Sequence, residues 1–235
     1  MSRLIPASAL FRFRVRCRPI DVSWEKVVSV ELSEVHRLPF FGELQGATAF
    51  ADVRMAWTEE ALIWQVEVAG KQQEYWSRST HPDASDGLQV FLDTRDVKQV
   101  QRGTQFCHRL VFPLPPPRQR VRKGISGSRE IEPIQLDLEG ARGQPARIAP
   151  SDMLGIASLR PDGYRLTAAV RATALTGLDQ TAGARLGFFY IVRDREFGAQ
   201  YWSLSDEYTR LADAPSLWGT VDLVPESGER AHPRR

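Results

Sequence analysis

Hydrophobic and polar residues alternate along much of the chain, which is the pattern of strands that bury one face. In FRFRVRCR at 11–18, four apolar side chains fall on one face and four arginines on the other. We expect a half-buried strand there. Its arginines either form a basic arm for phosphates or protect the edge of a sheet from pairing with another sheet. The edge interpretation is favoured, because nucleic-acid-binding proteins usually carry a wider basic field.

The same alternation predicts strands throughout the chain. Segments 48–57 and 61–68 are separated by a short acidic turn and indicate a hairpin. Only 173–178 suggests a helix, and it is short. Repeated strands without a long helical period favour an all-β fold, an antiparallel β-sandwich of jelly-roll type with one short helix. The other expected strands are 87–93, 105–112, 134–138, 154–159, 164–170, 185–192, 200–204 and 218–224.

Two segments interrupt this pattern. Segment 113–129 contains three consecutive prolines among basic residues, and it is no central strand because proline lacks the backbone N–H of the ladder. We expect an exposed loop, either simply solvated or docking a protein partner. The tail 225–235 is polar, and we expect it to be disordered. These features predict one β-sandwich domain over residues 1–224.

Composition narrows the class of protein. Hydrophobic residues make up 42% of the chain and include six Trp and eleven Phe, enough for a core. The 31 basic and 29 acidic residues leave a net charge of +2, so no nucleic-acid partner is predicted. No segment approaches the ~20 apolar residues of a membrane span, and arginines interrupt the start where a signal peptide would lie. The chain as written is expected in the cytoplasm, or outside the cell if its N-terminus is truncated or misassigned.

The residues that usually carry chemistry are sparse. No nucleophile elbow or glycine-rich phosphate loop is found. Cys107 and His108 are adjacent, so on a strand they point to opposite faces and form no zinc site. Cys17 and Cys107 are expected to be buried free thiols, although a bridge is possible if their strands are neighbours.

Carboxylates bracket the segment DGLQVFLDTRD. Asp86 and Asp93 are seven residues apart, so along a strand they lie ~23 Å from each other. A glycosidase needs its two acids ~5–10 Å apart, which excludes this pair. Asp93 and Asp96 lie where the strand ends, and we expect them to cap a turn and to pair with Arg95.

The tryptophans divide into two groups. Trp57 and Trp64 share strand faces with apolar residues, so we expect them in the core. Trp76 and Trp202 lie in polar connections close to turns. Exposed rings on the loops of a β-sandwich suit the apolar faces of sugars. The alternative is that each ring packs over one end of the sandwich.

The order of several segments resembles a family 9 carbohydrate-binding module, within the DOMON-like group of β-sandwiches. The resemblance covers about 24–223 and implies a non-catalytic antiparallel sandwich that binds the ends of mono- or oligosaccharides between two Trp rings. By position, Trp76 and Trp202 correspond to these rings. Gln89 falls where the family has the Glu of a D-x-x-E motif, and His108 or Arg109 falls near the polar contacts of the next strand. The segments are ADVRMAWTEEALIWQVEV, DGLQVFLDTRD, YRLTAAVRATALTGL, LGFFYIVRDRE, QYWS and PSLWGTVDL.

The expected function is therefore carbohydrate binding without catalysis. Calcium ions occur in the family, so calcium is possible here, but its ligands are not identifiable in this chain. Haem-binding relatives also exist, yet Met55 alternates with core residues and does not suggest an axial ligand. The first alternative is a structural or protein-interaction sandwich that docks through 113–129. The second is a glycan hydrolase, which would need Glu67, Asp86 or Glu196 to converge.

Overall fold

The computed structural model describes residues 11–117, 127–203 and 212–225. These residues form strands and short 3-10 helices, which confirms the all-β prediction. In place of the expected helix at 173–178, the chain makes the 3-10 helix η6 (Ala172–Ala174). The other 3-10 helices are η2 (Trp24–Ser29), η3 (Glu34–His36), η4 (Phe41–Gln45), η5 (Pro150–Asp152) and η8 (Pro215–Leu217).

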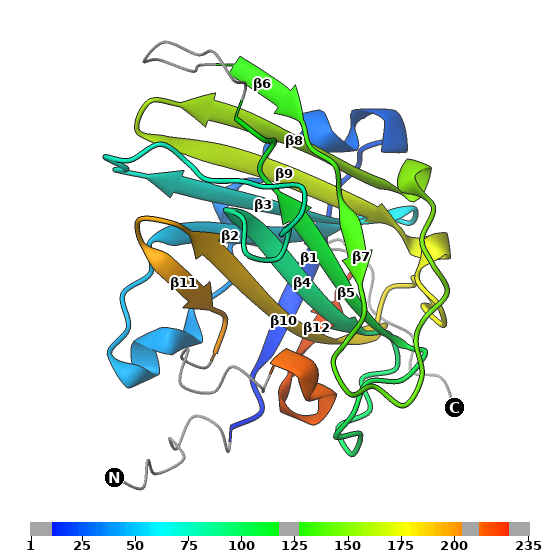
Figure 1. The fold of residues 1–235 in the computed structure, drawn as a ribbon. Coiled ribbons are helices and arrows are strands. Elements are labelled where there is room, and N and C mark those ends of the chain that lie inside the picture. Colours follow the sequence, from blue (N-terminus) through cyan, green and yellow to red (C-terminus); the bar gives the residue numbers. More distant parts are fainter. Residues whose placement is uncertain (1–10, 118–126, 204–211, 226–235) are drawn as a thin grey trace, which may run out of the picture.

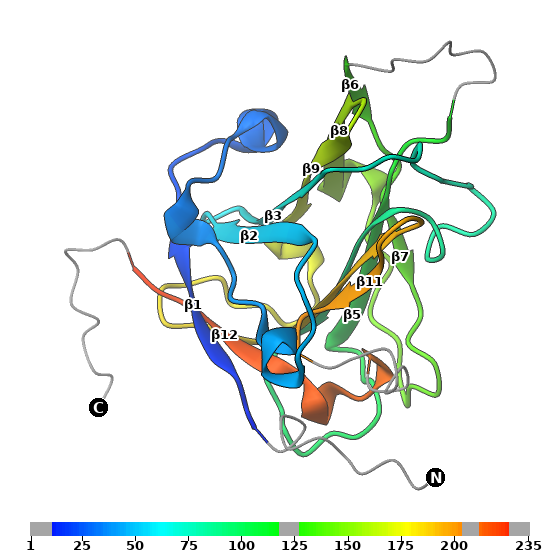
Figure 2. The same ribbon diagram turned by 90° about the vertical axis from the view of Figure 1, so that its left-hand side faces the viewer.

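The strands form two sheets that meet at β1 and face each other (Figures 1 and 2). The first sheet has the order β1-β12-β10-β4-β5-β7, with β11 paired to β10, and the second has the order β1-β2-β3-β9-β8-β6. The strands are β1 (Arg14–Pro19), β2 (Ala51–Trp57), β3 (Ala61–Ala69), β4 (Gly87–Asp93), β5 (Cys107–Pro113), β6 (Gly127–Glu130), β7 (Ile134–Leu136), β8 (Met153–Arg160), β9 (Gly163–Arg171), β10 (Arg185–Asp194), β11 (Gly198–Tyr201) and β12 (Gly219–Leu223).

Strand β1 departs from the prediction. Its first part pairs in parallel with β12, and Arg18 and Pro19 pair in parallel with β2. The sheets are therefore mixed rather than antiparallel throughout. In the strand order β1 lies between β12 and β2, so the prediction that it is an edge strand is wrong. Alternation in a sequence shows which face of a strand is buried, but not which strands lie beside it.

The core lies between the two sheets. Trp64 of β3 is fully buried, and its ring lies 6.1 Å from that of Phe112 on the facing sheet. Burying such a ring contributes about 5 kcal/mol. This outweighs the ~1–3 kcal/mol cost of its Nε1–H, which has no hydrogen-bond partner among the described residues. Trp57 is buried as well, and its Nε1 donates to the Cys17 carbonyl at 3.1 Å. Both tryptophans are core residues, as predicted.

The outer face of the second sheet is covered by the chain that follows β1. Trp24 and Val27 of η2 pack on Ile63 of β3 and Ala169 of β9. Gln65 fixes this cover: its Oε1 accepts the Leu32 N–H at 3.2 Å, and its Nε2 donates to the Val30 carbonyl at 3.1 Å. One polar strand residue thus holds an apolar segment against the sheet.

The remaining predictions have mixed outcomes. Cys17 and Cys107 are buried free thiols, as expected. Within the expected 113–129 loop, Pro113 ends β5 and Gly127–Glu130 forms β6 on the edge of the second sheet, while 118–126 lies outside the described residues. The tail 226–235 lies outside them too. Within the described ranges, no helix has the length and apolar character to cross a membrane.

Candidate functional site

The connection from β3 to β4 carries Trp76 and is tied down at its base. Asp86 ends this connection and is buried. Its Oδ2 accepts a hydrogen bond from the backbone N–H of Trp76 at 3.0 Å, and its own backbone N–H donates to the Trp76 carbonyl at 2.8 Å. Its Oδ1 accepts the Arg195 N–H at 2.7 Å. The Trp76 ring is partly exposed, and the Arg78 guanidinium lies 5.4 Å from its centroid.

A buried lysine holds the start of the same connection. Lys71 donates from Nζ to the two carboxylate oxygens of Asp194 at 2.5 and 2.6 Å. Asp86 and Glu196 each approach Nζ to 3.9 Å. The Phe197 ring lies 5.4 Å from the same ammonium. Three carboxylates thus surround one cation, which joins the 70–86 connection to the end of β10.

The excess of carboxylates affects their ionisation. Burial raises the pKa of Asp86 to about 6, and the neighbouring Asp194 adds to the rise. The N–H groups of Trp76 and Arg195 and the Lys71 ammonium act in the opposite direction. Asp86 therefore changes its charge close to neutral pH, while it carries the hydrogen bond to Trp76.

A second group of polar residues lies on the outer face of the first sheet. Gln89 of β4 is buried; its Nε2 donates to the Asp83 carbonyl at 2.7 Å, and its Oε1 accepts from Arg109 Nη2 at 2.9 Å. Arg109 also donates to the Asp83 carboxylate at 3.3 Å, and its guanidinium lies 5.6 Å above the Phe91 ring. Burial raises the pKa of Asp213, and the nearby Arg109 cation opposes that rise. Arg109 is therefore bound to the Asp83 carboxylate and lies near that of Asp213, with 20% of its side chain exposed.

His108 does not belong to this group. It is adjacent to Arg109 on β5, so its side chain points to the opposite face, where it is 0% exposed. Burial lowers its pKa to about 4, so it is neutral at physiological pH. The prediction of His108 as a ligand contact is therefore wrong; of the two candidates on this strand, only Arg109 faces outward.

Trp202 is also a core residue, so the prediction of an exposed ring there is wrong. It follows β11 and is 0% exposed. Its ring lies 5.0 Å from that of Phe188 and 5.5 Å from that of Phe41, and its Nε1 donates to the Pro39 carbonyl at 3.0 Å. The polar residues beside it in sequence are buried as well. Trp76 and Trp202 therefore do not form a pair of rings around a sugar.

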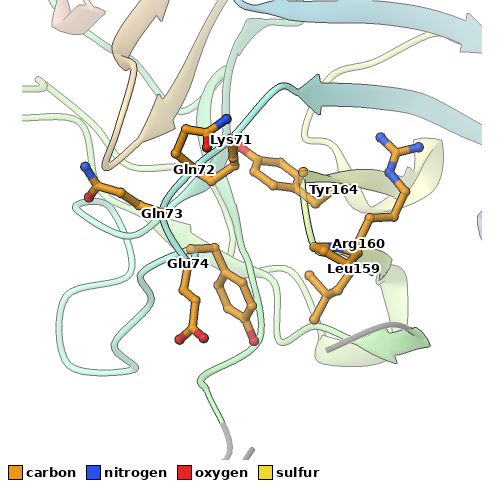
Figure 3. A pocket seen from close by; sticks show the side chains of 10 residues that line it. Lys71, Gln72, Gln73, Glu74, Leu159, Arg160 and Tyr164 are labelled. Carbon is orange, nitrogen blue, oxygen red and sulfur yellow. The ribbon is translucent and has the colours of Figure 1, made fainter. Parts of the chain in front are cut away.

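A pocket of about 290 Å³ lies beside the Trp76 connection, between segment 71–75 and the turn that joins β8 to β9. Figure 3 shows Leu159 and Tyr164 across this pocket from Gln73 and Glu74. The Tyr164 hydroxyl is buried without a hydrogen-bond partner among the described residues. Nothing in the sequence predicted this pocket, because its two walls are far apart in the chain.

The carboxylates named for a hydrolase converge only in part. Asp86 and Glu196 both approach Lys71, but Glu67 is elsewhere, where it accepts hydrogen bonds from Arg165 and pairs with Arg160. The Asp86 side chain is 2% exposed and the Glu196 side chain 14%. The cluster therefore offers no pair of accessible acids for glycosidic cleavage.

The turn after β4 binds its own backbone. Asp93 accepts the N–H groups of Arg95 at 3.0 Å and Val97 at 2.8 Å, which confirms its predicted role in the turn. The expected ion pair with Arg95 is replaced by one between Asp96 and Lys98 at 2.5 Å. Among the described residues, no three His, Cys, Asp or Glu side chains gather as ligands for a metal ion.

Comparison with known proteins gives similarities of structure alone. No family model matches the chain, and no curated protein does. A family 9 carbohydrate-binding module from Caldicellulosiruptor kristjanssonii, in complex with cellotriose, superposes with a TM-score of 0.59 at 16% identity, over 95% of this chain and 100% of that one. A family 9 module from the same organism in complex with glucose gives 0.55 at 16% identity, over 93% and 99%.

A third structure is a suspected carbohydrate-binding protein from Bacteroides uniformis. It superposes with a TM-score of 0.54 at 9% identity, over 91% of this chain and 100% of that one. These likenesses extend over nearly the whole of each protein, although the identities are low. The chain therefore has the fold of the family 9 carbohydrate-binding modules, as the order of its sequence segments predicted.

Proposed function

We propose that the chain is a non-catalytic carbohydrate-binding protein that holds a mono- or oligosaccharide beside Trp76 and Arg109. The observation that carries this proposal is the contact of Arg109, on the outer face of the first sheet, with Asp83 of the connection that also bears the partly exposed Trp76. The fold, shared with modules solved in complex with cellotriose and glucose, supports it.

The chemistry of the group suits a neutral sugar. Trp76 offers a flat apolar face on which the C–H groups of a pyranose stack. Arg109 supplies N–H donors and Asp83 supplies carboxylate acceptors, the two functions that neighbouring hydroxyl groups require. The charge of Arg109 is offset by Asp83 and Asp213. A charged sugar would therefore gain little here over a neutral one.

Gln89 acts through Arg109 rather than on the sugar. Both ends of its amide are already used, one by the Asp83 carbonyl and the other by Arg109. A glutamate at this position would bring a carboxylate against the Asp83 carbonyl and lose the 2.7 Å hydrogen bond. Gln89 therefore binds the Asp83 carbonyl in the loop with one end of its amide, and with the other end it serves as a positioning residue for Arg109.

The test is a titration of tryptophan fluorescence with glucose, cellotriose and a wider panel of neutral oligosaccharides. We expect saturable binding to at least one of them. Trp76→Ala is expected to abolish the response, because the stacking surface is lost. Arg109→Ala is expected to weaken binding at least tenfold, because removing one partner leaves polar groups of the sugar unpaired.

The control is Arg102→Ala, which removes an exposed arginine far from Trp76 in the sequence and has the same effect on net charge. It is expected to bind like the wild type. A wild-type protein that is folded by circular dichroism, yet gives no response to any sugar of the panel, contradicts the proposal. Recovery of a specific protein partner by the same sample would then favour the interaction module.

A further inference from the structure

The outer face of β1 carries a row of arginines that the proposed sugar site does not use. Arg14, Arg16 and Arg18 are exposed and alternate with the buried Val15 and Cys17. Alternate residues of a strand lie ~6.6 Å apart on one face. The three guanidinium groups therefore leave the sheet in one line.

Arg185 widens the row. Asp222 of β12 is the register partner of both Arg16 on β1 and Arg185 on β10, so these two arginines flank one carboxylate. That carboxylate is bound by Arg14, with Nε to Oδ2 at 2.5 Å and Nη2 to Oδ1 at 2.8 Å. Over the part of the chain that the structure describes, Arg16, Arg18 and Arg185 form no ion pair.

The position of β1 between two strands leaves this row only partly explained by edge protection. Charged side chains protect the open edge of a sheet, but β1 is not an edge strand: it pairs with β12 over Arg14–Cys17 and with β2 over Arg18 and Pro19. Like charges in line repel one another, and an anionic chain that lies along them relieves the repulsion. The positive charge of the row is therefore complementary to that of a linear polyanion.

Its shape favours carboxylates on a single chain. A nucleic-acid duplex binds to a wider basic field than one row supplies. The two-point contact of Arg14 with Asp222 is the geometry in which a guanidinium holds a carboxylate. Arg16 and Arg18 offer the same group, unused, on the same strand face.

We propose that the outer face of β1 docks an acidic polysaccharide, a linear chain of uronic acid residues whose carboxylates pair with Arg16, Arg18 and Arg185. This surface goes beyond the neutral-sugar site. It lies on β1, which β12 and β10 separate from the β4 and β5 strands that carry Gln89 and Arg109. Binding here would hold the protein on charged glycans independently of Trp76.

The experiment is affinity electrophoresis of the whole protein through gels that contain polygalacturonate, compared with gels that contain neutral hydroxyethyl cellulose. We expect polygalacturonate to retard the wild type and salt to abolish the retardation, because exposed ion pairs are screened. The double variant R16S/R18S is expected to bind several-fold and up to about thirtyfold more weakly, given the usual contribution of two exposed ion pairs. R16K/R18K, which keeps the charge but loses the two-point geometry, is expected to fall between them.

The matched control is R102S/R142S, which removes two exposed arginines of other loops and changes the net charge equally. It is expected to stay within twofold of the wild type. Lack of retardation of the wild type, equal losses in the two serine variants, or equally tight binding of duplex DNA would each overturn the proposal. Neutral-sugar binding is measured on the same samples and is expected to be unchanged in R16S/R18S, so failure of one site is distinguishable from failure of the other.

Discussion

The connection around Trp76 and the segment around Trp202 look alike in sequence but differ in the structure. Each places a tryptophan among polar residues close to a turn. Trp76 is partly exposed on a loop, whereas Trp202 is fully buried between the sheets. The polar neighbours explain the difference, because they are used in opposite ways.

Beside Trp202, polar side chains satisfy backbone groups in the interior. Gln200 accepts the N–H groups of Phe50 and Ala51 at 2.8 and 2.9 Å and donates to the Ala51 carbonyl at 3.0 Å. Beside Trp76, charged side chains instead hold the loop to the end of the sandwich, with Lys71 at the centre. Polarity around a tryptophan therefore does not predict exposure; what matters is whether the polar groups find partners inside.

The largest effect that separates the two regions is expected from alanine at each tryptophan. Trp202→Ala is expected to lower the free energy of unfolding by about 3–5 kcal/mol, because it leaves a cavity against Phe188 and Phe41. Trp76→Ala is expected to cost less than about 1 kcal/mol and to remove sugar binding instead. Urea denaturation followed by circular dichroism measures both. Equal losses of stability in the two variants would contradict the distinction between core and loop.

Lys71→Met tests whether the charged cluster holds the Trp76 connection. Removing the ammonium leaves three carboxylates without their cation, and we expect a loss of about 3 kcal/mol. The loss is expected to be accompanied by faster hydrogen exchange at Gln72 and Gln73, whose N–H groups bind Glu196. Lys26→Met, at an exposed position, is the control and is expected to cost less than about 0.5 kcal/mol. Unchanged stability and exchange in the Lys71 variant would show that the cluster does not hold the loop.

Local pattern predicted most of the strands. The hairpin of β2 and β3 was expected from alternation alone, and the two tryptophans within it are buried as predicted. Alternation also distinguishes His108 from Arg109, since neighbours on a strand face opposite sides. Only one of these two residues could therefore contact a ligand on the outer face, and this could have been predicted from the sequence.

Contacts between distant segments were beyond the sequence. Lys71 binds Asp194 across 123 positions of the chain, and no local pattern marks either residue as half of a buried pair. The parallel pairing of β1 with both β12 and β2 is equally non-local. The burial of Trp202 could not be predicted for the same reason, because its neighbour Gln200 binds backbone groups of Phe50 and Ala51, which are far away in sequence.

Gln89→Glu weakens a second attachment of the Trp76 loop, the hydrogen bond between Gln89 and the Asp83 carbonyl. The new carboxylate would face the Asp83 carbonyl, which now accepts a 2.7 Å hydrogen bond from the Gln89 amide. We expect a loss of about 1–2 kcal/mol in unfolding free energy and weaker sugar binding, measured by urea denaturation and calorimetry. Gln65→Glu, on the outer face of the second sheet and away from the loop, is expected to lower stability without changing the affinity for sugar. Tighter sugar binding in the Gln89 variant would contradict a positioning role.

The smallest expected effect is a change in Trp76 fluorescence with pH. Burial raises the pKa of Asp86 to about 6, so the folded protein binds this proton more tightly than the unfolded chain. The stabilisation from this group is therefore complete below about pH 4 and is lost as the pH rises through about 6. Because the same carboxylate accepts the Trp76 N–H, emission from Trp76 is expected to shift with an apparent pKa near 6.

Two variants test whether that shift comes from Trp76 and Asp86. Trp76→Phe is expected to abolish it, since Asp86 binds the backbone of Trp76, whereas Trp202 packs against Phe188. Asp86→Asn, which cannot titrate, is expected to hold the emission constant from pH 5 to pH 7.5. A shift that persists in Trp76→Phe would place the titrating group beside a core tryptophan, and the loop would then not be the pH-sensitive region. The apparent pKa of this shift is expected to change little with salt, because Asp86 and Lys71 are buried and buried charges are weakly screened.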